Sequence, residues 1–346
     1  MMKAFMQIAV GLRPLPKDGK TLSAFLYWAG RGHILGQVAA AHKGEASGKL
    51  ADILENARIR TAHDQRMLTF EAERISRALL GSGVQPILLK GAAYMALGLR
   101  AGQGRRVSDI DILVEEQELA EVETLLKKAG WQGEAATASD YDQDYYRQWM
   151  HELPPMRHKK RRTLIDVHHR LLPRTARLQP RHELMAARAK PIENNSLRTF
   201  DATDRFIHSA IHIFADGAFE TPARSFMELY YLFDDLSADE EAGLVARAAE
   251  VNALRPVAGA LWAVSHYFGE PKAHAVLRSM GVMGMSWSLR QTVRLWVRGG
   301  ALKPLAGFLL YLRSHYLRMP LGMLAKHLII KTFRRKRQAK EVGQAH

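Results

Sequence analysis

Two carboxylates alternate with aliphatic residues in the segment Ser108-Asp109-Ile110-Asp111-Ile112-Leu113-Val114. This alternation predicts a β-strand, and because strand side chains point to opposite faces in turn, Asp109 and Asp111 share one face. Two neighbouring carboxylates repel each other unless a cation lies between them, and oxygen ligands suit Mg²⁺. The pair therefore predicts a site for Mg²⁺, or for Mn²⁺ in its place.

A lysine and a glycine, Lys90-Gly91, follow the short apolar run 86–89 and precede a helical pattern at 92–97. A strand that passes through glycine into a helix presents free backbone N–H groups and a positive helix end, which together suit a phosphate. Lys90 adds a positive charge. An ordinary strand–turn–helix with a solvated lysine is the alternative, and the motif alone does not separate the two.

A third acid lies on another candidate strand, at 163–169, where Asp166 is flanked by Ile165 and Val167. Burial of an unpaired carboxylate is costly. A metal shared with Asp109 and Asp111, or a substrate hydroxyl, would explain the position of this acid. A salt bridge to one of the adjacent arginines is the alternative.

In combination, these motifs resemble the DNA polymerase beta-like nucleotidyltransferase superfamily, and more narrowly a bacterial nucleotidyltransferase family within it. The resemblance covers residues 60–235 and rests on Leu89-Lys90-Gly91, Arg106-Val107-Ser108-Asp109-Ile110-Asp111-Ile112-Leu113-Val114 and Ile165-Asp166-Val167-His168. It departs from the superfamily at Lys90-Gly91-Ala92, where Gly-Gly or Gly-Ser is usual. The serine hydroxyl that often holds a phosphate is missing there, and Lys90 would substitute for it.

The resemblance implies a Mg²⁺-dependent transfer of a nucleoside monophosphate from an NTP to a hydroxyl or phosphate acceptor. Asp109, Asp111 and Asp166 would be the catalytic, metal-binding residues, and Asp166 would accept the proton of the attacking hydroxyl. Of Arg105 and Arg106, only one can face the site on a strand, and Arg106 is favoured. The residues expected to bind the nucleotide and its phosphates are Lys90, Gly91, Arg106, Ser108, His168 and His212.

The acceptor expected from the resemblance is a small molecule, a glycan or a peptide in polysaccharide or natural-product biosynthesis. An RNA-modifying nucleotidyltransferase or toxin is one alternative. A catalytically silent binding module at a membrane surface is another, and the intact set of three acids argues against it.

Two further polar groups lie on predicted helices. Asp204, His208 and His212 are spaced four apart on one helix face, a spacing that can bind zinc. Their neighbours are strongly apolar, which favours a hydrogen-bonded packing face instead. The family resemblance favours a third interpretation, in which His212 faces the active-site cleft, with Arg224 and Glu228 of the next helix completing that wall.

The fold class expected from these patterns is α+β: a small mixed β-sheet of the polymerase beta type, preceded by helices and followed by a helical domain. Helical patterns occur at 24–41, at 49–80, at 115–130 and over most of the chain from 203 onward. We expect an N-terminal helical region at 1–80, a catalytic core at 81–200 and, at 201–346, a helical domain with a basic amphipathic C-terminal segment.

The composition limits the class of protein. The chain has 346 residues and is 47% hydrophobic, so it can bury a sizeable core. The absence of cysteine excludes disulfides and thiolate metal sites and fits a reducing compartment. No uncharged apolar run of about 18 residues occurs, so we predict no transmembrane helix. The expected location is the cytoplasm.

The net charge of +15 is concentrated near the C-terminus, because residues 271–340 contain 15 Lys or Arg and no acid. Amphipathic basic helices are predicted at 305–317 and 321–333, after a stripe formed by Arg290, Arg294 and Arg298. Residues 286–340 therefore form a candidate surface for an anionic membrane, where the protein would be peripheral, or for RNA. A helical lid packed on the core, with a solvated basic tail, is the alternative.

Overall fold

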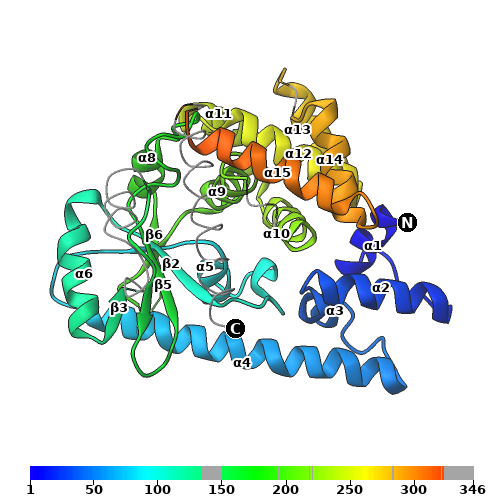
Figure 1. Ribbon diagram of the computed structural model, residues 1–346, viewed down its shortest axis with the longest axis horizontal. Helices are drawn as coiled ribbons and strands as arrows, with labels where there is room; N and C mark the ends of the chain where they lie inside the picture. Colours follow the sequence, from blue (N-terminus) through cyan, green and yellow to red (C-terminus); the bar gives the residue numbers. More distant parts are fainter. Residues whose placement is uncertain are drawn as a thin grey trace, which may run out of the picture.

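A mixed β-sheet packed among helices forms the centre of the computed structural model (Figure 1). The structure describes residues 1–133, 150–193, 195–217, 219, 221–282, 284–320 and 322. The α+β class expected from the sequence is confirmed, with helices before the sheet and a helical part after it.

Seven strands make up the sheet in the described residues: β1 (Ile87–Leu88), β2 (Asp109–Leu113), β3 (Trp131–Gly133), β4 (Met156–His158), β5 (Leu164–His168), β6 (Lys190–Pro191) and β7 (Arg198–Thr199). Their order is β3-β4-β5-β2-β1-β7-β6. β2 is parallel to β5 and β1 to β7, and the other neighbours are antiparallel. The sequence predicted β1, β2 and β5. It missed the other four, which are two or three residues long and lie in no apolar run such as the one at 86–89 that indicated β1.

Four helices precede the sheet: α1 (Met2–Ala9), α2 (Gly19–Arg31), α3 (Leu35–Ala41) and α4 (Gly48–Ala78). α4 confirms the long helix expected at 49–80, and it runs along one side of the molecule as far as the sheet (Figure 1). The helical pattern expected at 24–41 is confirmed, but it is divided between two helices, α2 and α3. His33 has a φ of 55°, which is left-handed backbone, and this turn separates α2 from α3.

Short helices connect the strands: α5 (Lys90–Ala96), the 3₁₀ helices η1 (Arg100–Gly102) and η2 (Glu116–Glu118), α6 (Leu119–Lys128) and α8 (His182–Ala187). α6 carries the apolar stripe expected at 115–130, and it buries Val122 and Leu126. α5 follows β1 directly. Its first residue, Lys90, has a φ of 47° and is held in left-handed backbone.

In the described part of the chain, seven helices follow the sheet: α9 (Ala202–Phe214), α10 (Pro222–Asp234), α11 (Ala238–Glu250), α12 (Leu254–Phe268), α13 (Pro271–Ser279), α14 (Trp287–Arg298) and α15 (Lys303–Arg318). α9, α10 and α12 pack together, and Phe226 of α10 stacks on Tyr267 of α12 with ring centroids 5.3 Å apart. α1 packs on α12, where Gln7 donates a hydrogen bond to the Phe268 carbonyl at 3.0 Å. The N-terminal and C-terminal helices therefore share one core.

α15 crosses the helical part of the molecule (Figure 1). Its buried side chains, Ala306, Leu310 and Ser314, are spaced four apart and lie on one face. Its C-terminal end is tied to the segment after β5, because the Arg177 amide donates to the Leu317 carbonyl at 2.9 Å. The predicted helix at 305–317 is thus present and packed on the core, whereas the one predicted at 321–333 lies outside the described residues. Among the residues described, no helix is both long and apolar enough to cross a bilayer.

Candidate active site

The three predicted acids lie together on two adjacent strands. β2 and β5 are parallel, with Asp111 directly opposite Asp166. Asp109 stands two residues before Asp111, so all three side chains are on the same face of the sheet. The sequence placed these acids on strands, and the register between the strands brings them together.

Asp111 is the best-supported carboxylate of the three. It is buried, with Lys90 Nζ 3.0 Å and His168 Nε2 2.9 Å from its Oδ1 atom. Burial acts to raise the pKa of Asp111, but the positive charge of Lys90 and the hydrogen bond from His168 outweigh it and hold this pKa well below 3.8. Asp111 is therefore ionised, and Lys90 and His168 both contact it. The binding of nucleotide phosphates by these two residues stays a prediction.

Asp166 has the opposite environment. Its pKa is raised to about 7 by burial and by the negative charges of Asp111 and Glu152. Its Oδ1 atom is buried and makes no hydrogen bond within the described part of the chain. Asp166, with one oxygen unbonded and an ionised carboxylate beside it, is therefore in a position to bind a cation or to hold a proton.

Two further acids adjoin this group and were missed by the sequence reasoning. Glu152 lies beside His168, with its Oε2 atom 3.4 Å from Nδ1. Asp216 pairs through Oδ1 with Arg318 Nε at 2.7 Å, and its Oδ2 atom is 3.6 Å from His212 Nδ1. Burial raises the pKa of each carboxyl group, although nearby cations oppose the shift. The His212-x-x-x-Asp216 spacing was the one sequence signal for Asp216.

A pocket of about 550 Å³ opens beside the acids. Asp109, Asp111 and Lys90 line its sheet side, and side chains of α15, such as Tyr311 and Arg318, line the opposite side. The remaining cationic and histidine side chains around it are Arg105, Arg224, His212 and His315. The pocket is therefore rich in donors that suit a polyanion, and α15 forms part of its wall.

Arg105, not Arg106, lies at this pocket. The buried Arg105 pairs through Nε with Glu228 Oε1 at 2.7 Å, and Arg224 lies 3.5 Å from the same oxygen. Gly91 makes room for it, since a Cβ atom at Gly91 would lie only 1.2 Å from Arg105 Nη1. The lack of a side chain at Gly91 is therefore explained by the packing of Arg105. Of the wall expected from Arg224 and Glu228, Arg224 lines the pocket, whereas Glu228 is buried behind it as the partner of Arg105.

The favoured assignment of Arg106 is not supported by its position. Arg106 is exposed and pairs with Asp64 of α4, with Nε 3.0 Å from Oδ2, and it lines a separate hollow against α4. Residues 105 and 106 precede β2, so strand alternation did not decide which of them faces the site. Ser108 is exposed, and its hydroxyl donates to Asp109 Oδ1 at 3.3 Å.

Asp204, His208 and His212 do not form a metal site. Asp204 is bound by Arg247, with hydrogen bonds of 2.9 and 2.7 Å. His208 packs edge-on against Phe200, and burial lowers its pKa to about 3. His212 alone lines the pocket. Asp204 and His208 therefore belong to a packing face, and His212 faces the cleft.

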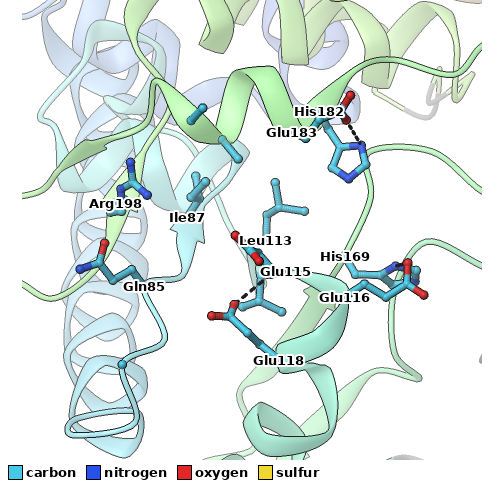
Figure 2. Close-up of a pocket in the computed structure, with 14 residues that line it drawn as sticks. Gln85, Ile87, Leu113, Glu115, Glu116, Glu118, His169, His182, Glu183 and Arg198 are labelled. Carbon is cyan, nitrogen blue, oxygen red and sulfur yellow. Dashed lines mark hydrogen bonds and ion pairs between the residues drawn. The ribbon is translucent and has the colours of Figure 1, made fainter.

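A second pocket, of about 540 Å³, lies at the other end of β1 and β2, beside Ile87 and Leu113 (Figure 2). Its acidic and histidine side chains form local pairs, among them His182 with Glu183 at 3.5 Å and His169 with Glu116 at 3.7 Å. None of the predicted site residues lines this pocket.

Comparison with known families decides the class of protein. The profile of a family described as an uncharacterised nucleotidyltransferase matches residues 19–269, which is most of the chain. The chain belongs to this nucleotidyltransferase family. The resemblance derived from the Lys90-Gly91, Asp109/Asp111 and Asp166 motifs is therefore confirmed, and the chain is an enzyme that transfers nucleotidyl groups.

Comparison with solved structures returned the antibiotic-resistance factor ANT(2'')-Ia, whose solution structure has been determined. The present chain and ANT(2'')-Ia share 15% sequence identity at a TM-score of 0.36. The match covers 55% of the present chain and 96% of the other. Likeness at that level supports no conclusion about the present chain. Among curated proteins, no significant match was found.

Proposed function

We propose that this nucleotidyltransferase moves a nucleoside monophosphate from an NTP to a hydroxyl or phosphate group of a small molecule, glycan or peptide, with release of pyrophosphate and with Mg²⁺ as cofactor. One observation carries the proposal: Asp109, Asp111 and Asp166 share one face of adjacent strands, and two of them line a pocket rich in cationic groups. A triphosphate is the polyanion that such a pocket suits.

The residues present fit a divalent cation. All three acids offer oxygen ligands, which Mg²⁺ prefers. The raised pKa of Asp166, the result of burial and of the negative charges of Asp111 and Glu152, and the unbonded Oδ1 atom of Asp166 show a local excess of negative charge. Asp109, Asp111 and Asp166 would hold the ion, and bound Mg²⁺ would supply neutralisation of charge on the nucleotide phosphates.

The protein groups have distinct tasks in this proposal. Lys90, held against Asp111, places a positive charge at the edge of the pocket, and Arg105 and Arg318 extend it along the walls. Arginine side chains can bind phosphate oxygens through two parallel hydrogen bonds. Asp166 would take the proton of the attacking hydroxyl, because a carboxyl group whose pKa lies near neutrality is a suitable general base.

A labelled-nucleotide assay tests the reaction. Purified protein is incubated with each α-labelled NTP, Mg²⁺ or Mn²⁺, and a lysate separated into RNA, protein, glycan and small-molecule fractions. Label should appear in one of the last three fractions with the wild type, and Asp111→Asn should abolish the transfer while the protein stays folded. Asp52→Asn, on the exposed side of α4, serves as the matched control. Label in RNA alone would favour the RNA-modifying alternative, and full activity of Asp111→Asn would refute the metal site.

A second candidate, peripheral contact with an anionic membrane, is favoured by the outer face of α15. Leu305, Phe308, Leu309 and Tyr316 are all exposed there, at 43% to 56%. Their spacing makes an apolar stripe in a stretch of chain, 271–340, that carries no acid. The contact would place a cytoplasmic enzyme at the membrane surface; the cytoplasmic location itself stays a prediction.

Vesicle flotation tests the membrane contact. Wild-type protein should float with anionic vesicles and not with neutral ones. Phe308→Ser/Leu309→Ser should weaken flotation, whereas Leu80→Ser, at an even more exposed leucine beyond the end of α4, should not. If the serine pair has no effect, or if the protein binds RNA with a steep salt dependence and vesicles not at all, the membrane contact is wrong.

A further inference from the structure

Three side chains next to the acids form a group that has no ligand of its own in the proposed reaction. His151, Glu152 and His168 each present a donor atom, and the three donor atoms lie within 4.8 Å of one another. Glu152 Oε2 is 3.4 Å from His168 Nδ1 and 3.8 Å from His151 Nε2. In tetrahedral zinc sites, bonds of about 2.0–2.1 Å separate the ligand atoms by about 3.3 Å. The observed separations are therefore close to those of a metal-ligand set.

The backbone holds these residues in place. Glu152 and His168 face each other in an antiparallel bridge. On one side of the bridge the Leu153 amide donates to the Val167 carbonyl at 2.8 Å, and on the other the His169 amide donates to the His151 carbonyl at 2.9 Å. The ligand set is thus attached to β5 and to a segment bonded along it, so little reorganisation is needed to close it around an ion.

The second nitrogen of His168 is oriented as in a metal site. Its Nε2 atom is 2.9 Å from Asp111 Oδ1, which leaves Nδ1 directed at Glu152. Histidine ligands of metals usually bond a carboxylate through the nitrogen that does not bind the ion, and this contact fixes the orientation of the ring.

Both histidines are buried, which sets them apart from solvated surface histidines. His168 is 4% exposed and His151 is 7% exposed, and their ring centroids are 5.3 Å apart. The Nδ1 atom of His151 is buried with no hydrogen-bond partner in the described residues. Among the described residues, no hydrogen bond to this Nδ1 atom explains the placement of the second ring beside the first.

We propose that His151, Glu152 and His168 form a site for a divalent transition metal of the zinc class, separate from the carboxylates assigned to Mg²⁺. Two imidazole nitrogens and one carboxylate oxygen select Zn²⁺ or Co²⁺ over Mg²⁺, which prefers oxygen ligands alone. Through His168 the ion fixes the carboxylate of Asp111, so this site positions the catalytic group without touching substrate. The site itself does not depend on the proposed reaction.

Cobalt binding tests this site without an activity measurement. Metal-free full-length protein is titrated with Co²⁺, and bound metal is measured by elemental analysis and by the strong visible absorption of four-coordinate Co²⁺. We expect one tightly bound Co²⁺ per chain, displaced by Zn²⁺ and not by Mg²⁺. His151→Gln and Glu152→Gln should each weaken binding by about 100-fold or more, since even outer residues of metal sites contribute about 10- to 100-fold.

The controls distinguish the new site from the carboxylates of the active site. His182→Gln, at the other pocket, and Asp109→Asn should both keep the full Co²⁺ signal. Thermal melting verifies that each variant is folded, and Glu152→Gln provides a near-isosteric change if His151→Gln does not fold. Absence of stoichiometric Co²⁺ from the wild type, an unchanged spectrum in folded Glu152→Gln, or loss of the signal in Asp109→Asn would each overturn the proposal.

Discussion

Replacement of Gly91 by alanine should destabilise the protein, although alanine is the better helix former. Gly91 is the second residue of α5, and its φ is not in the left-handed region. Helix propensity alone would therefore make Gly91→Ala stabilising by about 1 kcal/mol. The opposing effect is steric, because the new Cβ atom would lie 1.2 Å from Arg105 Nη1 and 2.5 Å from Arg105 Cζ.

The magnitude follows from the ion pair that would be broken. Arg105 and Glu228 are both buried and lie 2.7 Å apart. Displacement of the guanidinium would leave Glu228 without its main partner, and loss of one member of a buried pair costs about 3–5 kcal/mol. After subtraction of the propensity gain, Gly91→Ala should lower the free energy of unfolding by about 2–4 kcal/mol.

A double-mutant cycle in urea denaturation measures this effect. In the background Arg105→Ala/Glu228→Gln the clash and the ion pair are both absent, so the further change Gly91→Ala should be within about 1 kcal/mol of neutral. The γ-methyl group of Val107, 2.7 Å from the Cβ position, can move aside by side-chain rotation. Equal destabilisation by Gly91→Ala in both backgrounds would refute the reasoning. If the only role of Gly91 were to let a phosphate approach, Gly91→Ala would lower NTP affinity without a change in stability, and that result would also refute it.

Three further predictions concern other parts of the structure. In EDTA, the stability that Asp166 contributes should fall as the pH rises from about 4 to about 7, because folded Asp166 keeps its proton up to a pKa of about 7 whereas the unfolded group loses it near 3.8; the difference in melting temperature between the wild type and Asp166→Asn should therefore change over this pH range, and parallel pH profiles of the two proteins would contradict the assignment. Arg247→Met should lower the free energy of unfolding by about 3–5 kcal/mol, because it leaves buried Asp204 unpaired. Urea denaturation measures this free energy, and a change below about 1 kcal/mol would mean that Asp204 has another partner. Arg318→Ala removes a cation from the pocket and leaves buried Asp216 without its arginine partner, so it should raise KM for the NTP in steady-state kinetics and also lower the melting temperature; an unchanged KM in the folded variant would exclude Arg318 from the nucleotide pocket.

Local sequence patterns predicted the elements that carry the acids. The alternation in Asp109–Leu113 and in Leu164–His168 has the period of a strand, and both segments are strands. The long helix α4 was equally clear, because its apolar stripe recurs over many turns. These features depend on neighbours in the chain, and a single sequence contains that information.

The partners of the site residues depend on the tertiary structure. Whether Arg105 or Arg106 faces the pocket is decided by Glu228, which lies more than a hundred residues further along the chain. Gly91 is needed because Arg105 packs against it, and no local pattern shows that contact.

The position of His151 and Glu152 beside His168 shows the same limit. A single antiparallel bridge brings them together, and the segment before β4 has no periodicity that reveals it. Likewise, only the tertiary structure shows that the basic helix α15 packs on the core through its Ala306–Leu310–Ser314 face, which leaves the outer face for a partner. The sequence alone determined which residues could do chemistry and on which strands they lie. Long-range packing decided which of them meet, because strand register, buried ion pairs and helix docking join residues far apart in the chain.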